Sequence, residues 1–142
     1  MEPFEINELV DIKGESGLWR LVKQLRGATL FESIVTGKRK TIPQTRNVQV
    51  LDQLVIFTEE GETIKLEKVL DNLSEIEEQG QEIPRSIKGL STEKLFDLME
   101  DAAPYHDTKR FKPYHLDTIL KWYHIINEAL ERINAETAPK PG

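Results

Sequence analysis

Short apolar runs broken by turn residues fill the first part of the chain, from about residue 6 to residue 65. Runs rich in β-branched and aromatic residues favour strands, and they lie at 17–25, 29–35, 39–42, 48–50, 54–58 and 63–65. Pro43 ends one of them because proline donates no ladder hydrogen bond. Several short strands within about 60 residues predict a small, strongly curved barrel.

Alternation along the first long strand predicts which of its faces is buried. Leu18, Arg20, Val22 and Gln24 fall on one face and Trp19, Leu21, Lys23 and Leu25 on the other. The face with Trp19, Leu21 and Leu25 is the more apolar, so we expect it to line the core. Arg20 then points outward, and Lys23 lies at the rim.

After residue 65 the spacing of apolar residues changes to the helical period. The first helix is predicted from Leu66, Val69, Leu70, Leu73 and Ile76. Residues 80–90 contain two glycines and a proline and form a linker, after which Ser91 caps a second helix. Pro113 suits the first turn of a long third helix that continues to about residue 134.

The apolar stripe of the long helix is too broad to be covered from one side. One side is expected to meet the preceding helix, and the other the barrel or a second chain. The candidates for such an interface are Trp122, Tyr123 and Ile126.

These patterns together predict an α+β fold in four segments. A small SH3-like β-barrel occupies residues 1–65, and an amphipathic helix with its linker occupies 66–90. A helical hairpin follows at 91–134, and a disordered tail at 135–142.

Composition then excludes several kinds of chemistry. The chain has 142 residues and no cysteine, so disulfides, thiolate zinc sites and cysteine nucleophiles are excluded. The acidic N-terminus does not have the pattern of a secretory signal, and no apolar run reaches the roughly 20 residues of a membrane span. We therefore expect a cytoplasmic protein that does not enter the membrane.

The remaining residues do not point to catalysis. The three histidines, His106, His115 and His124, are nine residues apart, which places the last two on opposite sides of one helix. Metal sites on helices need spacings of three or four. No nucleophile elbow or phosphate loop is present, so we expect no enzyme, no catalytic residue, no metal, no cofactor and no small-molecule substrate.

Charge is unevenly distributed along the sequence. The formal net charge is −6, yet residues 16–50 carry a single acidic residue against seven basic ones: Arg20, Lys23, Arg26, Lys38, Arg39, Lys40 and Arg46. Residues 51–104 carry fourteen acidic and five basic residues. The basic stretch either binds a polyanion or is neutralised within the molecule by the acidic helix at 66–79.

The order of short motifs resembles that of an uncharacterised bacterial family with a domain of unknown function. The motifs are GLWRLV at 17–22, RG at 26–27, FES at 31–33, GKR at 37–39 and DTILKWY at 117–123. The similarity extends over about residues 6–134. The resemblance implies an SH3-like small barrel followed by helices, and it implies no activity.

Two functions of different classes remain open. The broad apolar face of the last helix favours a non-catalytic module for binding a protein partner or for self-association. The basic stretch favours the alternative, a module that binds RNA, the ribosome or DNA through the residues between 20 and 46.

Overall fold

The computed structural model describes residues 4–137, which form two compact units. Unit 1 comprises residues 4–51 and 124–137, and unit 2 comprises residues 52–123. The long helix α3, Pro113–Thr137, contributes its first part to unit 2 and its last part to unit 1. Each unit is described by itself below.

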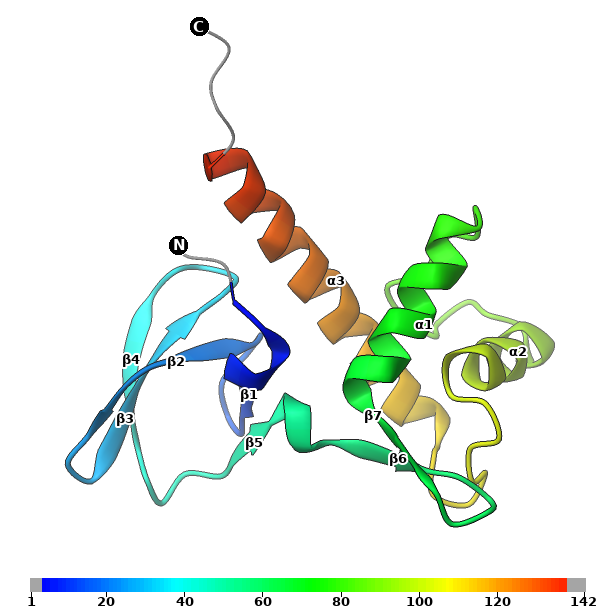
Figure 1. Ribbon diagram of the computed structural model, residues 1–142, viewed down its shortest axis with the longest axis horizontal. Helices are drawn as coiled ribbons and strands as arrows, with labels where there is room; N and C mark the ends of the chain where they lie inside the picture. Colours follow the sequence, from blue (N-terminus) through cyan, green and yellow to red (C-terminus); the bar gives the residue numbers. More distant parts are fainter. Residues whose placement is uncertain (1–3, 138–142) are drawn as a thin grey trace, which may run out of the picture. The chain divides into compact units, whose positions relative to one another are not determined.

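Unit 1 is built on a five-stranded antiparallel sheet in the order β4-β3-β2-β1-β5 (Figure 1). Its strands are β1 Leu9–Ile12, β2 Trp19–Leu25, β3 Ala28–Ser33, β4 Arg39–Pro43 and β5 Val48–Val50. The edge strands β4 and β5 do not pair with each other, so the sheet is open. The predicted SH3-like barrel, which requires closure, is therefore not confirmed.

A β-bulge in β2 changes the predicted faces of that strand. Leu21 pairs with Phe31 but Lys23 pairs with Leu30, so one extra residue is inserted between them. The bulge places Gln24 on the face of Trp19 and Leu21 and sends Leu25 to the other face. Strict alternation was therefore wrong beyond Leu21.

The core of unit 1 lies on the concave face of the sheet. Val10, Ile12, Trp19, Phe31 and Ile42 are buried there, with Val48 and Val50 packed against them. Leu21 and Leu25, predicted as core residues, are 43% and 38% exposed. The end of α3 is tied to the turn after β3, because Arg132 Nη2 donates to the Ile34 carbonyl at 2.7 Å.

Unit 2 begins with a separate two-stranded sheet, β6 Val55–Phe57 and β7 Thr63–Lys65. Both strands were predicted, but they do not extend the sheet of unit 1. A short 3₁₀ turn, Leu51–Gln53, separates β5 from β6 and buries Leu51 completely. β7 then runs without a loop into α1, Leu66–Glu78.

The three helices agree with the predicted ones. α2, Thr92–Ala102, is capped as expected by Ser91, whose hydroxyl accepts from the Lys94 N–H at 3.2 Å. α1 is bonded to α2 by Asn72 Nδ2, which donates to the Ala102 carbonyl at 2.9 Å. The mixed α+β fold of a sheet and three helices is therefore confirmed.

The end of α3 lies further along the chain than the pattern predicted. The helix continues to Thr137 instead of residue 134. Residues 138–142 of the predicted tail lie outside the described residues. None of the helices described between residues 4 and 137 combines the length and the apolar composition that a membrane span needs.

Candidate functional site

The basic stretch is largely paired with carboxylates of its own unit. Four of its seven cations form ion pairs: Arg20 with Glu8 at 3.8 Å, Arg39 with Glu32 at 3.1 Å, Lys40 with Glu15 at 2.6 Å and Arg46 with Glu15 at 3.8 Å. The other three, Lys23, Arg26 and Lys38, are exposed and have no ion pair within residues 4–137.

These three cations do not form one patch. Arg26 lies in the turn before β3 and Lys38 in the turn after it. A strand of six residues is about 20 Å long at the usual rise per residue. Lys38 is therefore separated from Arg26 by the length of β3.

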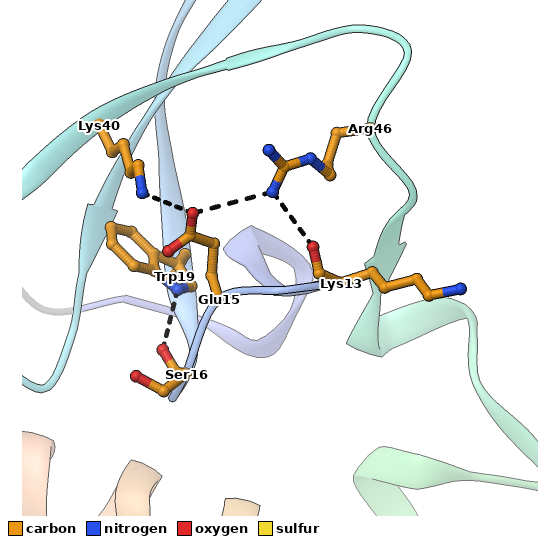
Figure 2. A network of polar contacts seen from close by, with 6 residues as sticks. All are labelled: Lys13, Glu15, Ser16, Trp19, Lys40 and Arg46. Carbon is orange, nitrogen blue, oxygen red and sulfur yellow. Dashed lines mark hydrogen bonds and ion pairs between the residues drawn. The ribbon is translucent and has the colours of Figure 1, made fainter.

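Glu15 is the centre of a polar cluster in unit 1 (Figure 2). Its carboxylate reaches Lys40 of β4 on one side and Arg46, from the segment before β5, on the other. Arg46 also donates to the Lys13 carbonyl at 3.3 Å, and Trp19 Nε1 donates to the Ser16 carbonyl at 3.1 Å. The cluster therefore ties β4, the β1–β2 turn and the segment before β5 together.

Beside this cluster the concave face opens into a half-open pocket of about 440 Å³. We call it the unit 1 pocket, and its lining comes entirely from unit 1. Its apolar lining comprises Val10, Leu21, Phe31, Ile42, Pro43, Val48 and Val50. Its polar lining comprises Asn7, Glu8, Gln24, Thr29, Gln44 and Arg46.

Three side-chain amides are the main polar feature of this pocket. Asn7, Gln24 and Gln44 each offer an N–H donor and a carbonyl acceptor. The buried Thr29 hydroxyl donates to the Gln24 carbonyl oxygen at 3.0 Å. This bond fixes the Gln24 amide and leaves its N–H groups for a ligand, since no described residue is recorded as accepting from them.

The ionisable groups of the pocket are already engaged. Glu8 pairs with Arg20, and Arg46 with Glu15 and the Lys13 carbonyl. No histidine lines the pocket. Among the described residues, no group of three or more His, Asp or Glu side chains is placed to hold a metal ion.

Two of the three histidines, His106 and His115, serve local structure in unit 2. His106 is buried and its Nδ1 bonds the Ala103 carbonyl at 2.8 Å. Phe111 contacts the rings of both His106 and His115, with centroid distances of 5.1 and 6.2 Å. His115 Nδ1 accepts from the Lys112 backbone N–H at 2.9 Å, as the third residue of a capping box does.

The predicted interface residues of α3 do not form one exposed face. Tyr123 is buried, and its hydroxyl donates to Glu77 of α1 at 3.0 Å. Trp122 and Ile126 are half-buried. The three side chains therefore do not offer a free surface of the kind that the apolar stripe indicated.

Sequence reasoning did not find the pocket. Its amides, Asn7, Gln24 and Gln44, come from three separate places in the chain and share no motif. Gln24 reaches the concave face because of the bulge, which the alternation pattern could not show. The apolar lining residues, among them Leu21, Phe31 and Val48, indicated only strands.

Comparisons with known proteins identify families but no activity. A family model described as "Domain of unknown function (DUF6852)" matches residues 54–126. A second one, described as "Domain of unknown function (DUF5606)", matches residues 6–51. The two matches meet where the structure divides into unit 1 and unit 2. The resemblance to an uncharacterised family is confirmed.

A solved structure supports the same fold. A solution NMR structure of a protein from Bacteroides vulgatus superposes with a TM-score of 0.65 at 21% identity. The similarity covers 97% of this chain and 98% of that chain. At this identity the likeness concerns the fold alone. No curated protein matches the chain.

Proposed function

This chain belongs to the family of the domain of unknown function DUF6852, whose description names no activity. We propose its function from the geometry of unit 1. The chain is a non-catalytic interaction module that binds a peptide segment of a partner protein in the unit 1 pocket. The observation that carries this proposal is the pocket itself, with an apolar floor and an amide rim.

The size and lining of the pocket suit one large apolar side chain and the backbone around it. Pockets of a few hundred Å³ with apolar walls and a few fixed polar groups are typical of specific binding sites. Leu21 is 43% exposed at the pocket, so apolar surface remains for a ligand to cover.

The polar groups favour a peptide over a charged small molecule. Primary amides carry the same donor and acceptor pair as a peptide bond, so Asn7, Gln24 and Gln44 can bond to an extended backbone. Glu8 and Arg46 are paired already, and a charged ligand would have to displace those partners. The same pairing supports a non-catalytic role, because general acid–base work needs an available titratable group.

The alternative of RNA or DNA binding has less support. Backbone recognition of nucleic acid needs several free cations along one surface. Four of the seven cations are paired within unit 1, and Arg26 and Lys38 lie at opposite ends of β3.

Two exposed leucines of β2 give a matched test. Leu21 lines the pocket, whereas Leu25 lies on the other face beyond the bulge. A random peptide library displayed on phage is selected against the full chain, and the enriched peptides are titrated into ¹⁵N-labelled protein. We expect shifts in the amides of β2, β3 and β5, and one large apolar residue common to the peptides.

The variants decide whether the pocket is the site. Leu21→Glu should weaken peptide binding about tenfold or more, because it places a charge where apolar surface would be buried. Leu25→Glu should leave binding unchanged. Equal binding to both variants, or no enriched peptide at all, would overturn the proposal.

A further inference from the structure

The small sheet of unit 2 has one face that is exposed and rich in large apolar side chains. Ile56 and Ile64 pair with each other and turn inward, so their neighbours turn outward. Val55 and Phe57 lie on this outer face and are 39% and 41% exposed. We call it the unit 2 outer face.

The loop between α2 and α3 lies against the end of β6 through an isolated β-bridge. Thr58 forms a bridge with His106, the Asp107 N–H donates to the Phe57 carbonyl at 2.8 Å, and the Glu59 N–H donates to the Tyr105 carbonyl at 3.0 Å. These bonds hold the backbone of residues 105–107 beside residues 57–59, at the edge of the outer face. Tyr105 is 73% exposed.

Tyr105 is held outward at a conformational cost. Its φ of +61° lies in the left-handed region, where a bulky residue is uncommon. Besides its carbonyl bond to Glu59, its N–H donates to Glu100 Oε1 at 2.9 Å. Residues held in such conformations cluster at binding sites, and here the result is an aromatic ring presented to solvent.

The charges around the outer face are mainly negative, although Lys65, the cross-strand partner of Val55, and Arg110, which stacks on Phe57, also lie there. Glu59, Glu60 and Glu62 occupy the β6–β7 turn, and Glu100 lies against the Tyr105 backbone. Residues 52–123 carry sixteen acidic and nine basic side chains. A partner for this face is therefore expected to be basic.

Unit 2 itself shows how a cation sits on this face. The Arg110 guanidinium lies 4.5 Å from the centroid of the Phe57 ring, and its Nε is 3.7 Å from Asp107. An aromatic ring with a neighbouring carboxylate is thus already a guanidinium site in this surface. Tyr105 has a similar combination, because its N–H donates to Glu100 Oε1 and no cation lies over its ring among the described contacts. Glu100 Oε2 also lies 3.5 Å from His106 Nδ1.

We propose that the unit 2 outer face binds an arginine-containing basic segment of a partner protein, with an arginine stacked on Tyr105 and paired with the adjacent carboxylates. The apolar contacts of Val55 and Phe57 would add to the cation–π contact. This inference rests on unit 2 alone and does not depend on the pocket of unit 1.

The test uses two short peptides of equal length, one with several arginines spaced by glycine and serine, the other with citrulline at each arginine position. Citrulline keeps the shape of the side chain but has no charge. Each is titrated into the ¹⁵N-labelled full chain at about 0.1 M salt, where exposed charges are screened beyond roughly 10 Å. We expect the arginine peptide to shift the amides of residues 55–59 and 105–107, and the citrulline peptide to shift none.

Two tyrosine variants separate this face from general attraction to an acidic protein. Tyr105→Asn removes the ring while placing a residue that tolerates positive φ, so the fold is retained. It should weaken the arginine peptide about fivefold. Tyr114→Asn removes another exposed ring of unit 2, 65% exposed, and should leave binding unchanged.

The outcomes are distinct. Loss of affinity in Tyr105→Asn alone, with an unchanged melting temperature, supports the proposal. If both variants bind the arginine peptide equally well, or if the peptide also shifts the backbone amides of the acidic residues in α1, the attraction comes from net charge alone and the proposal is overturned. Binding of the citrulline peptide with the same affinity would overturn the role of the guanidinium.

Discussion

Replacing Glu15 by glutamine should destabilise unit 1 by removing the charge that holds two cations together. The Glu15 carboxylate is 15% exposed, 2.6 Å from Lys40 Nζ and 3.8 Å from Arg46 Nη1. Glutamine keeps the volume and one carbonyl acceptor but leaves Lys40 and Arg46 facing each other without a carboxylate between them.

The magnitude follows from the partial burial of the cluster. A hydrogen bond to a charged group contributes about 1.5–3 kcal/mol, and an exposed ion pair about 0.2–1 kcal/mol. Glu15 is nearly buried but Lys40 and Arg46 are 52% and 41% exposed, so solvent screens their side of the interaction. We expect a loss of about 1.5 kcal/mol for Glu15→Gln, or about 3–6 °C in melting temperature.

The assay is urea unfolding followed by the NMR signal of the Trp19 indole N–H. This group bonds to the Ser16 carbonyl next to Glu15 and lies in unit 1, whereas Trp122 lies in unit 2, so its signal reports on unit 1. A double-mutant cycle adds Lys40→Met, and the coupling energy between the two sites should be about 1 kcal/mol. Lys38→Met is the matched control, because Lys38 has no ion pair among the described residues.

Salt provides a second check on the same reasoning. Raising the ionic strength from about 0.1 to 1 M shortens the Debye length from roughly 10 to 3 Å. The difference between wild type and Glu15→Gln should then shrink. A coupling energy no larger than that of the Lys38 control, or a difference that salt leaves unchanged, would refute the electrostatic account of the cluster.

Three further changes test local features by their urea midpoints. Gly17→Ala should lower the free energy of unfolding by about 1 kcal/mol more than Gly37→Ala does. Both glycines have positive φ, but only at Gly17 would the new Cβ meet a neighbour, Val35 at 3.2 Å. Equal losses in the two variants would contradict this. Asp117→Ala should lower the free energy of unfolding by about 2 kcal/mol, because the Asp117 carboxylate accepts hydrogen bonds from the Ile87 N–H and the Ser86 hydroxyl, each at 2.9 Å, and so attaches the linker to α3. The same bonds lower the pKa of Asp117 below its ordinary 3.8. This stabilisation is present above pH 3.8 and is lost as the pH falls through the lowered pKa. Burial, and after it the charge of Lys112, lowers the pKa of His115 from its ordinary 6.5. As the pH falls below about 6.5, the unfolded chain therefore takes up a proton at His115 before the folded chain does, and the free energy of unfolding falls. His115→Gln, which keeps a capping-box acceptor, should abolish that step, and a step that persists would assign it to another group.

The helices could be predicted from the sequence because their signals are local. Apolar residues three and four apart, Ser91 as a cap and Pro113 in a first turn each act within one or two turns of backbone, and α1, α2 and α3 begin where these signals place them. Six of the seven strands, β2 to β7, were found for the same reason, whereas β1, Leu9–Ile12, was not predicted.

The arrangement of the strands could not be predicted in the same way. Whether β6 and β7 join the first sheet depends on pairing between distant segments, and the buried Leu51 turn separates them. The bulge in β2 depends on how that strand fits β3, and it moves Gln24 into the pocket and Leu25 out of the predicted core.

The candidate sites were beyond sequence reasoning for a related reason. The pocket joins Asn7, Gln24 and Gln44, and the outer face of unit 2 joins Phe57 with Tyr105. Each of these sets brings together segments that lie far apart in the sequence. None of them leaves a motif in the printed sequence.

The sequence alone therefore determined the local elements, the absence of cysteine chemistry and the uneven distribution of charge. The tertiary structure decided which strands pair, which faces are buried and which charges neutralise one another, as when Glu15 meets Lys40 twenty-five residues later. The reason is physical: helix and turn signals depend on sterics and hydrogen bonds within a few residues. Pairing and burial depend on the free energy of the whole packed unit, to which every distant segment contributes.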